Sequence, residues 1–153
     1  MSTTTTQPTE KHVQSSALHR EKTGERMANQ NLLVRRITVG LSLAVVGAIH
    51  ILDLPSKFDE TPYLAVAYIG IILAVAVLVE RILVVGSRID FLAAAALSAA
   101  VIVGFIVNRT VGMPMATGDI GNWLEPLGLL SLAVEGFVIW QALVAVALHR
   151  TRR

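Results

Sequence analysis

The sequence contains no cysteine. This absence excludes disulfide bonds, thiolate-bound metals, iron–sulfur clusters and cysteine nucleophiles. Charged residues are also scarce, since they make up 16% of the 153 residues, whereas soluble domains carry about 25%. Together with a hydrophobic content of 54%, this composition excludes a soluble enzyme, a nucleic-acid-binding domain and a small secreted module.

Motifs for common catalytic chemistry are missing as well. The sequence has no glycine-rich phosphate loop before a helix, no HExxH zinc pair and no serine-centred nucleophile elbow. No lysine lies within an apolar run, which excludes a retinal Schiff base. We therefore expect a protein that is not an enzyme, and the sequence requires no cofactor.

What the sequence does contain is four long apolar runs, at about 37–54, 63–85, 89–107 and 123–148. A helix of about 20 residues crosses a hydrocarbon core about 30 Å thick. None of the runs alternates with the two-residue period of a barrel strand. The sequence thus predicts an all-α bundle of four transmembrane helices, with a membrane domain over residues 35–150.

Residues 1–34 are polar and of mixed charge, which predicts a mostly disordered cytoplasmic tail. Residues 17–31 have the composition of a short surface helix. The ends of the later helices carry capping signals, because Ser87 precedes Asp90 by three residues and Asn122 precedes Glu125 by three. Four prolines fall at helix ends or connections, namely Pro55, Pro62, Pro114 and Pro126. We expect the first span to end before Pro55.

The placement of Lys and Arg predicts the topology. Of thirteen such residues only Lys57 and Arg109 fall on one side of a four-helix hairpin, so the remaining eleven fall on the other side. Both termini of a multi-pass membrane protein are therefore predicted to be cytoplasmic. This imbalance also argues against a protein that inserts in both orientations.

Small residues recur at four-residue spacing in the third run, at Ala96, Ala100 and Gly104. Such a stripe allows helices to approach closely within a membrane. It predicts a packing seam inside the bundle, and a homodimer interface is the alternative.

Glu135 is the most informative polar residue. It lies twelve residues beyond Trp123, so it is about 18 Å along the fourth helix and close to the middle of a membrane. A buried carboxyl group at this depth requires a reason. One interpretation is a proton or cation site, or an anchor for a ligand. The other is a protonated side chain bonded to a neighbouring helix.

His50 lies near the end of the first run, with Asp53 three residues later on the same helix face. A carboxylate in that position can orient an imidazole ring. Met113 and Met115 lie in the outer loop, and thioethers with imidazole suit Cu(I). A copper or haem-linked site using His50, Met113 and Met115 is therefore a weak hypothesis, beside the simpler interpretation of an interfacial histidine.

Arg109 ends the third run on the side with few basic residues. It is either part of an ion pair that fixes the outer loops, with Asp53, Glu125 or Glu135 as partner, or a clamp for a carboxylate or other anion. We expect His50, Asp53, Arg109, Glu125 and Glu135 to be the candidate residues for binding a ligand or a proton.

Several of these residues stand in segments that resemble small four-helix integral membrane proteins of bacteria, especially actinobacteria. Such proteins carry an Arg-Thr-x-Gly-Leu-Pro motif after the third helix and a Glu in the fourth. The resemblance covers residues 37–148, with Met113 in place of the expected Leu. It implies a fold and a location, that of a multi-pass protein in a bacterial plasma membrane, but no activity. Its segments are Ala48-Ile49-His50, Asn108-Arg109-Thr110-Val111-Gly112-Met113-Pro114, Glu125-Pro126-Leu127-Gly128 and Glu135.

The leading hypothesis is a non-enzymatic membrane protein with an outward-facing polar site that binds a small ligand or supports a membrane complex. The alternatives are a small proton-coupled transporter that uses Glu135 and an outward copper or haem-linked protein that uses His50. The expected partners are the lipid bilayer and a homo-oligomer or larger membrane complex, without nucleic acid.

Overall fold

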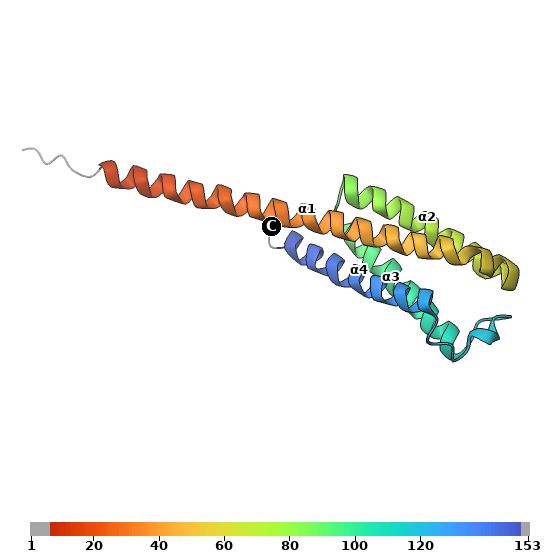
Figure 1. Cartoon of the computed structure of the whole chain (residues 1–153). Helices are drawn as coiled ribbons and strands as arrows, with labels where there is room; N and C mark the ends of the chain where they lie inside the picture. Colours follow the sequence, from red (N-terminus) through yellow and green to blue (C-terminus); the bar gives the residue numbers. More distant parts are fainter. Residues whose placement is uncertain (1–6, 151–153) are drawn as a thin grey trace, which may run out of the picture. The chain divides into compact units, whose positions relative to one another are not determined.

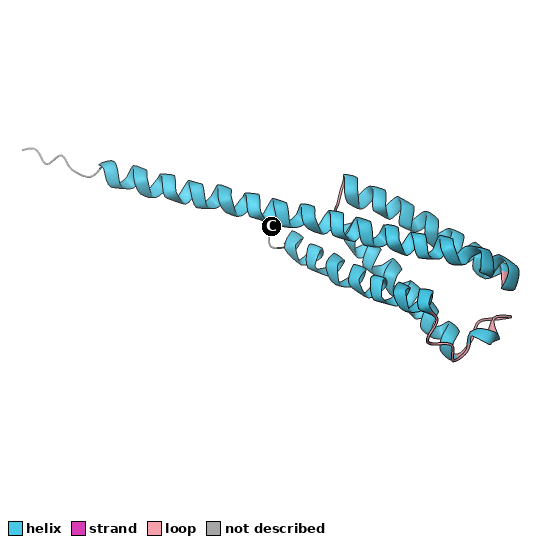
Figure 2. Cartoon of the chain, viewed as in Figure 1, coloured by secondary structure: helices cyan, strands magenta, loops and turns pink. Residues whose placement is uncertain are grey.

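The computed structural model describes residues 7–150, and side chains are described for residues 14–16 and 18–150. Four helices make up most of this part of the chain, with a short 3-10 turn, η1, at Thr117–Asp119 (Figures 1 and 2). No strand occurs within residues 7–150, so the predicted all-α architecture is confirmed. The helices are α1 at Gln7–Glu60, α2 at Pro62–Val84, α3 at Arg88–Thr110 and α4 at Pro126–Arg150.

The chain forms two compact units, residues 1–34 and residues 35–153. Within the first unit, residues 7–34 are helical, so the expectation of a mostly disordered tail is corrected there. Residues 1–6 lie outside the described part. The helix is continuous because no proline follows Pro8 until Pro55, and Gly24 is the one glycine before Val34. The remaining residues include many good helix formers such as Ala, Glu, Lys, Gln and Leu.

In the second unit α1 continues past Pro55 and ends at Glu60, so the predicted end of the first helix at residue 54 is wrong. Proline lacks a backbone N–H and removes one hydrogen bond of the helix. Here the hydroxyl of Ser56 donates to the backbone carbonyl of Asp53 over 2.8 Å. The backbone N–H of Thr61 still donates to the carbonyl of Lys57 over 2.9 Å. Proline therefore costs the helix one bond without ending it.

All four helices are long and apolar enough to cross a membrane, judged by length and composition. Each also presents large apolar side chains outward, for example Leu41 on α1, Leu73 on α2, Val103 on α3 and Trp140 on α4, all more than half exposed. A soluble monomer rarely exposes so much contiguous apolar surface. The outer surface of the bundle is thus suited to lipid.

The turn between α2 and α3 closes one end of the bundle. Gly86 has a φ of +61°, and the backbone N–H groups of Val85 and Gly86 both donate to the carbonyl of Arg81. This is a helix C-terminus of the type that favours glycine. Immediately afterwards Ser87 and Asp90 form the predicted capping box, which is confirmed. Arg81 also donates to Asp90 over 2.6 Å, so the turn is tied on both sides.

The second predicted capping box, between Asn122 and Glu125, does not form. α4 begins at Pro126 rather than at residue 123, with proline at a position where no N–H is required. Glu125 is left just outside the helix, where its carbonyl accepts from Leu129 over 3.0 Å. Its carboxylate is therefore available to bind elsewhere.

The packed core lies in the half of the bundle near the α2–α3 turn. Large apolar residues from all four helices meet there and are almost fully buried, among them Leu43, Ile82, Phe91 and Val138. Arg36 joins α1 to α2 at this end of the bundle, because its guanidinium donates to the backbone carbonyls of Ile82 and Leu83. The opposite half of the bundle is packed differently and contains the candidate site.

Candidate ligand-binding site

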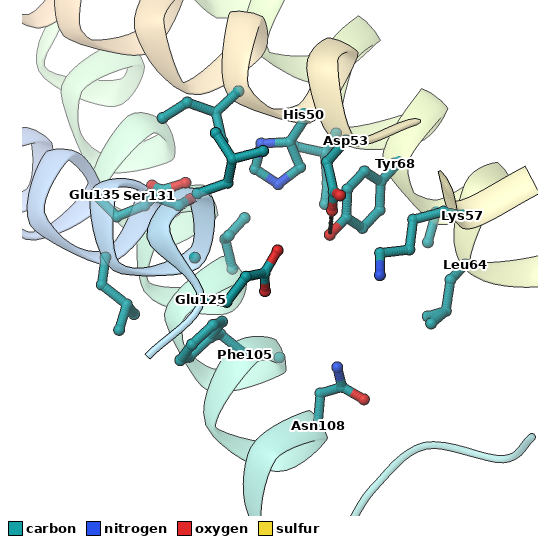
Figure 3. A pocket seen from close by; sticks show the side chains of 18 of the residues that line it. His50, Asp53, Lys57, Leu64, Tyr68, Phe105, Asn108, Glu125, Ser131 and Glu135 are labelled. Carbon is teal, nitrogen blue, oxygen red and sulfur yellow. Dashed lines mark hydrogen bonds between the residues drawn. The ribbon is translucent and has the colours of Figure 1, made fainter. Parts of the chain in front are cut away.

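A cavity of about 300 Å³ lies between the four helices, in the half of the bundle away from the α2–α3 turn (Figure 3). The loop between α3 and α4 also contributes residues to its wall. All five polar residues selected from the sequence line this one cavity: His50, Asp53, Arg109, Glu125 and Glu135.

Small residues create the space. Ala67 on α2, Ala100 and Gly104 on α3, and Gly128 on α4 all line the cavity. A Cβ atom added at Gly104 meets nothing within 4 Å. The stripe on α3 therefore does not form the predicted close packing seam at Gly104. Its small side chains instead leave room beside the polar residues.

On the α1 and α2 side of the cavity, Asp53 accepts hydrogen bonds from two hydroxyl groups. Its Oδ2 accepts a hydrogen bond from the hydroxyl of Tyr68 on α2 over 2.9 Å, and its Oδ1 accepts from the hydroxyl of Ser56 over 3.0 Å. Figure 3 shows the bond between Tyr68 and Asp53 at the wall of the cavity. Asp53 thus has two neutral donors and joins the two helices.

His50 is buried beside this pair, with its ring centroid 4.9 Å from that of Tyr68. Its Nδ1 lies 2.9 Å from the backbone carbonyl of Val46. Since a carbonyl only accepts, Nδ1 is the donor in this bond. The expected orientation of His50 by Asp53 is therefore corrected, because a carbonyl one turn earlier holds the ring instead.

Arg109 holds the α3 and α4 side of the cavity and is 4% exposed. Its guanidinium binds Asp119 over 2.7 Å and also forms an ion pair with Glu125. Glu125 is one of the partners considered from the sequence, whereas Asp119 is not. The arginine therefore fixes the loop between α3 and α4, and its charge is matched by two carboxylates.

The ring of Phe105 packs against the guanidinium group of Arg109. The guanidinium carbon of Arg109 lies 5.0 Å from the centre of the Phe105 ring, a cation–π distance. The ring fits against α4 because residue 128 is glycine, where a Cβ atom would lie 2.5 Å from Phe105 Cε2. Gly128 thus leaves room for the Phe105 ring, and that ring packs against Arg109.

The carboxylate of Asp119, in the turn η1, has several partners. Asn108 donates to its Oδ2 over 2.9 Å, and Lys57 lies 3.9 Å away across the cavity on α1. Partial burial raises the pKa of Asp119, but the hydrogen bonds from Asn108 and Arg109 and the charges of Arg109 and Lys57 lower it further, so the net pKa is below its usual value. Asp119 is therefore held as a carboxylate.

Glu135 differs from the other carboxylates because no cation pairs with it among the described residues. It is 1% exposed and lines the cavity, where Figure 3 shows it beside Ser131. The hydroxyl of Ser98 on α3 is near it, but neither this hydroxyl nor either carboxyl oxygen of Glu135 has a hydrogen bond. This is the least satisfied polar group of the cavity.

The three residues of the copper hypothesis do not all lie in the cavity. His50 and Met113 both line the cavity, but Met115 does not and is 87% exposed. Across residues 7–150, the structure contains no group of three or more His, Asp or Glu residues arranged to hold a metal ion. The arrangement gives this hypothesis no further support.

Besides Ser131, four polar or charged residues of the cavity wall were not selected from the sequence: Lys57, Tyr68, Asn108 and Asp119. Tyr68 carried a signal, because it is a hydroxyl-bearing side chain within an apolar span. Lys57 is the one lysine on its side of the bundle. Asn108 lies in the last turn of α3 and Asp119 in η1, and nothing in their spacing indicated that they would be bonded.

No family model, curated protein or solved structure matches this chain.

Proposed function

We propose that this chain is a membrane protein that binds a small ligand in the cavity between its four helices. The observation that carries the proposal is the convergence of Asp53 from α1, Arg109 from α3 and Glu135 from α4 on one cavity. Small-molecule sites are typically concave and mostly apolar, with a few placed polar groups. The cavity has this character, and its volume of about 300 Å³ suits a small molecule.

We further propose that the site faces away from the cytoplasm. Lys57 and Arg109, the two basic residues at this end, are both buried and ion-paired. Neither therefore adds free positive charge to the loops. This supports the assignment of the termini to the cytoplasmic side by the positive-inside rule.

The proposal is tested with three matched probes that share an aromatic ring and a two-carbon chain: phenethylammonium, phenethyl alcohol and phenylacetate. Binding to the full chain in lipid nanodiscs is measured by calorimetry, with empty nanodiscs subtracted. We expect saturable binding of at least one probe. The variant Gly104→Leu should abolish this binding, since a side chain at Gly104 enters the cavity without meeting a neighbour at its Cβ.

The matched control is Gly70→Leu. Gly70 is an exposed helical glycine on α2, outside the cavity wall, and a Cβ there also meets nothing within 4 Å. This variant should keep wild-type binding. Absence of saturable binding by all three probes, or equal effects of the two leucine variants, would overturn the proposed function.

The isolation of Glu135 favours proton-coupled transport as a second candidate function. A buried carboxylate without a partner is costly, so this group retains a proton or binds a counter-cation. Alternation between these two states is the chemistry that an exchanger needs. In proteoliposomes with a pH gradient, flux of a bound probe that is lost in Glu135→Gln would support this candidate. Binding without any gradient-dependent flux would exclude it.

A further inference from the structure

Building on the proposed binding function, we infer that the ligand is an organic cation, of the class of a small aromatic or alkyl ammonium, and that Glu135 is its counter-ion. The four acidic side chains that line the cavity are Asp53, Asp119, Glu125 and Glu135, and its two basic side chains are Lys57 and Arg109. The fixed charges of the wall therefore leave an excess of acidic groups.

The two cations of the wall are already occupied. Arg109 binds both Asp119 and Glu125, and Lys57 lies within 4 Å of Glu60 and Asp119. A bound anion would have to displace one of these carboxylates from its partner. The cavity is therefore poorly suited to a carboxylate or phosphate ligand, even though it contains an arginine.

The two acidic groups that remain are not matched by a cation within the described residues. Asp53 is held by the neutral hydroxyls of Tyr68 and Ser56. Glu135 has neither an ion pair nor an ordinary hydrogen bond, although it is 1% exposed and lines the cavity. An ammonium group would supply both the charge and the donors that this carboxylate lacks.

The rest of the wall suits the apolar part of such a molecule. Aliphatic side chains such as Ile71, Leu97 and Leu132 line the cavity, together with the rings of Tyr68 and Phe105. Aromatic faces attract cations as well as apolar groups. The Phe105 ring already faces Arg109, so Tyr68 is the ring we assign to the ligand.

The matched probes test this inference. Phenethylammonium should bind the full chain in nanodiscs more tightly than phenethyl alcohol, and phenylacetate should bind least. Glu135→Gln should weaken phenethylammonium binding by about thirtyfold or more, because loss of one partner of a buried charge pair has an effect of this size. It should leave phenethyl alcohol binding nearly unchanged.

The control is Glu80→Gln, which removes the same charge from an exposed position on α2 that does not line the cavity. It should leave the binding of all three probes unchanged. Equal affinities of the wild-type chain for the ammonium and the alcohol would overturn the inference, and so would unchanged ammonium binding in Glu135→Gln. In either case a loss of binding in Gly104→Leu would still support binding in the cavity. Should Glu135→Gln fail to fold, the comparison of probes on the wild-type chain decides. Failure of every probe rejects the binding function itself.

Discussion

The hydroxyl of Tyr68 on α2 lies 2.9 Å from Oδ2 of Asp53 on α1. This bond joins the two helices at the wall of the cavity, next to the buried ring of His50. We predict that Tyr68→Phe lowers the free energy of unfolding by about 1 kcal/mol, since interhelical hydrogen bonds in membranes average below that and bonds to charged groups exceed it. Unfolding by denaturant in mixed micelles measures the change.

Tyr63→Phe is the control for this prediction. The hydroxyl of Tyr63 donates to the backbone carbonyl of Pro114 over 2.7 Å, but the side chain is 43% exposed. Water can replace an exposed bond more easily than a buried one. A loss in Tyr63→Phe as large as that in Tyr68→Phe would contradict the importance assigned to the Asp53 bond.

Arg109 is the second site at which a substitution should have a clear effect. Arg109→Gln leaves Glu125 without its cation and leaves Asp119 with only the more distant Lys57. We expect a loss of about 2–3 kcal/mol, below the value for fully buried pairs because Asp119 and Glu125 remain partly exposed. Arg109→Lys should restore only part of it, because lysine cannot bind two carboxylates with a planar fork.

A double-mutant cycle with Glu125→Gln separates the ion pair from the rest of the change. The double variant should be more stable than the sum of the single losses implies. Strict additivity of the two substitutions would show that Arg109 and Glu125 do not interact in the folded protein.

Asp119 should make the loop between α3 and α4 sensitive to acid. Its pKa in the folded chain is lower than the ordinary value of 3.8, because the hydrogen bonds and charges around it outweigh the opposing effect of burial. The group therefore contributes stability that is complete above the unfolded pKa and is lost as the pH falls through the lower folded pKa. The protection of residues 111–125 from hydrogen exchange, corrected for the intrinsic pH dependence of exchange, should fall over that acidic range.

Asp119→Asn provides the comparison. It should lower the protection of this loop at neutral pH and abolish the further loss of protection in acid. An unchanged acid dependence in Asp119→Asn would assign the effect to another carboxylate.

Gly86 and Gly70 should respond oppositely to alanine. Gly86 has a φ of +61°, and a Cβ there would lie 2.5 Å from Nε of Arg36. Gly86→Ala should therefore cost about 1–2 kcal/mol from the backbone alone, and it should also disturb the bond from Arg36 to Ile82. Gly70→Ala meets nothing within 4 Å and should stabilise α2 by up to about 1 kcal/mol. Thermal midpoints of both variants in micelles compare the two, and equal shifts would refute the distinction.

The proposed topology is testable because the chain has no cysteine of its own. A single cysteine at Leu124, which is 82% exposed in the loop between α3 and α4, should react with a membrane-impermeant maleimide in intact cells. A single cysteine at Asn29 should react only after the membrane is permeabilised. The reverse pattern would place the cavity on the cytoplasmic side.

The sequence by itself determined that four long apolar helices form, but not all of their ends. Apolar runs of this length satisfy their backbone groups only as helices when they lie in lipid, so the positions of α2 and α3 were predicted to within a few residues. The Ser87–Asp90 capping box was equally local, because it depends on residues three positions apart. The same local reasoning failed at Pro55, where one lost hydrogen bond was too small a cost to end α1.

Only the tertiary structure decided which side chains meet. Arg109 and Glu135 could be selected from the sequence because burying a charged group is costly and requires a reason. That argument does not identify the residues they contact. Asp119 lies ten residues from Arg109 in an irregular loop, and Tyr68 reaches Asp53 from another helix. No periodicity relates such positions. The cavity likewise arises because Ala100 and Gly104 line it together with Ala67 of α2 and Gly128 of α4, whereas larger residues on those helices would have filled the space. Side-chain volume on one helix defines a space only together with the helices opposite.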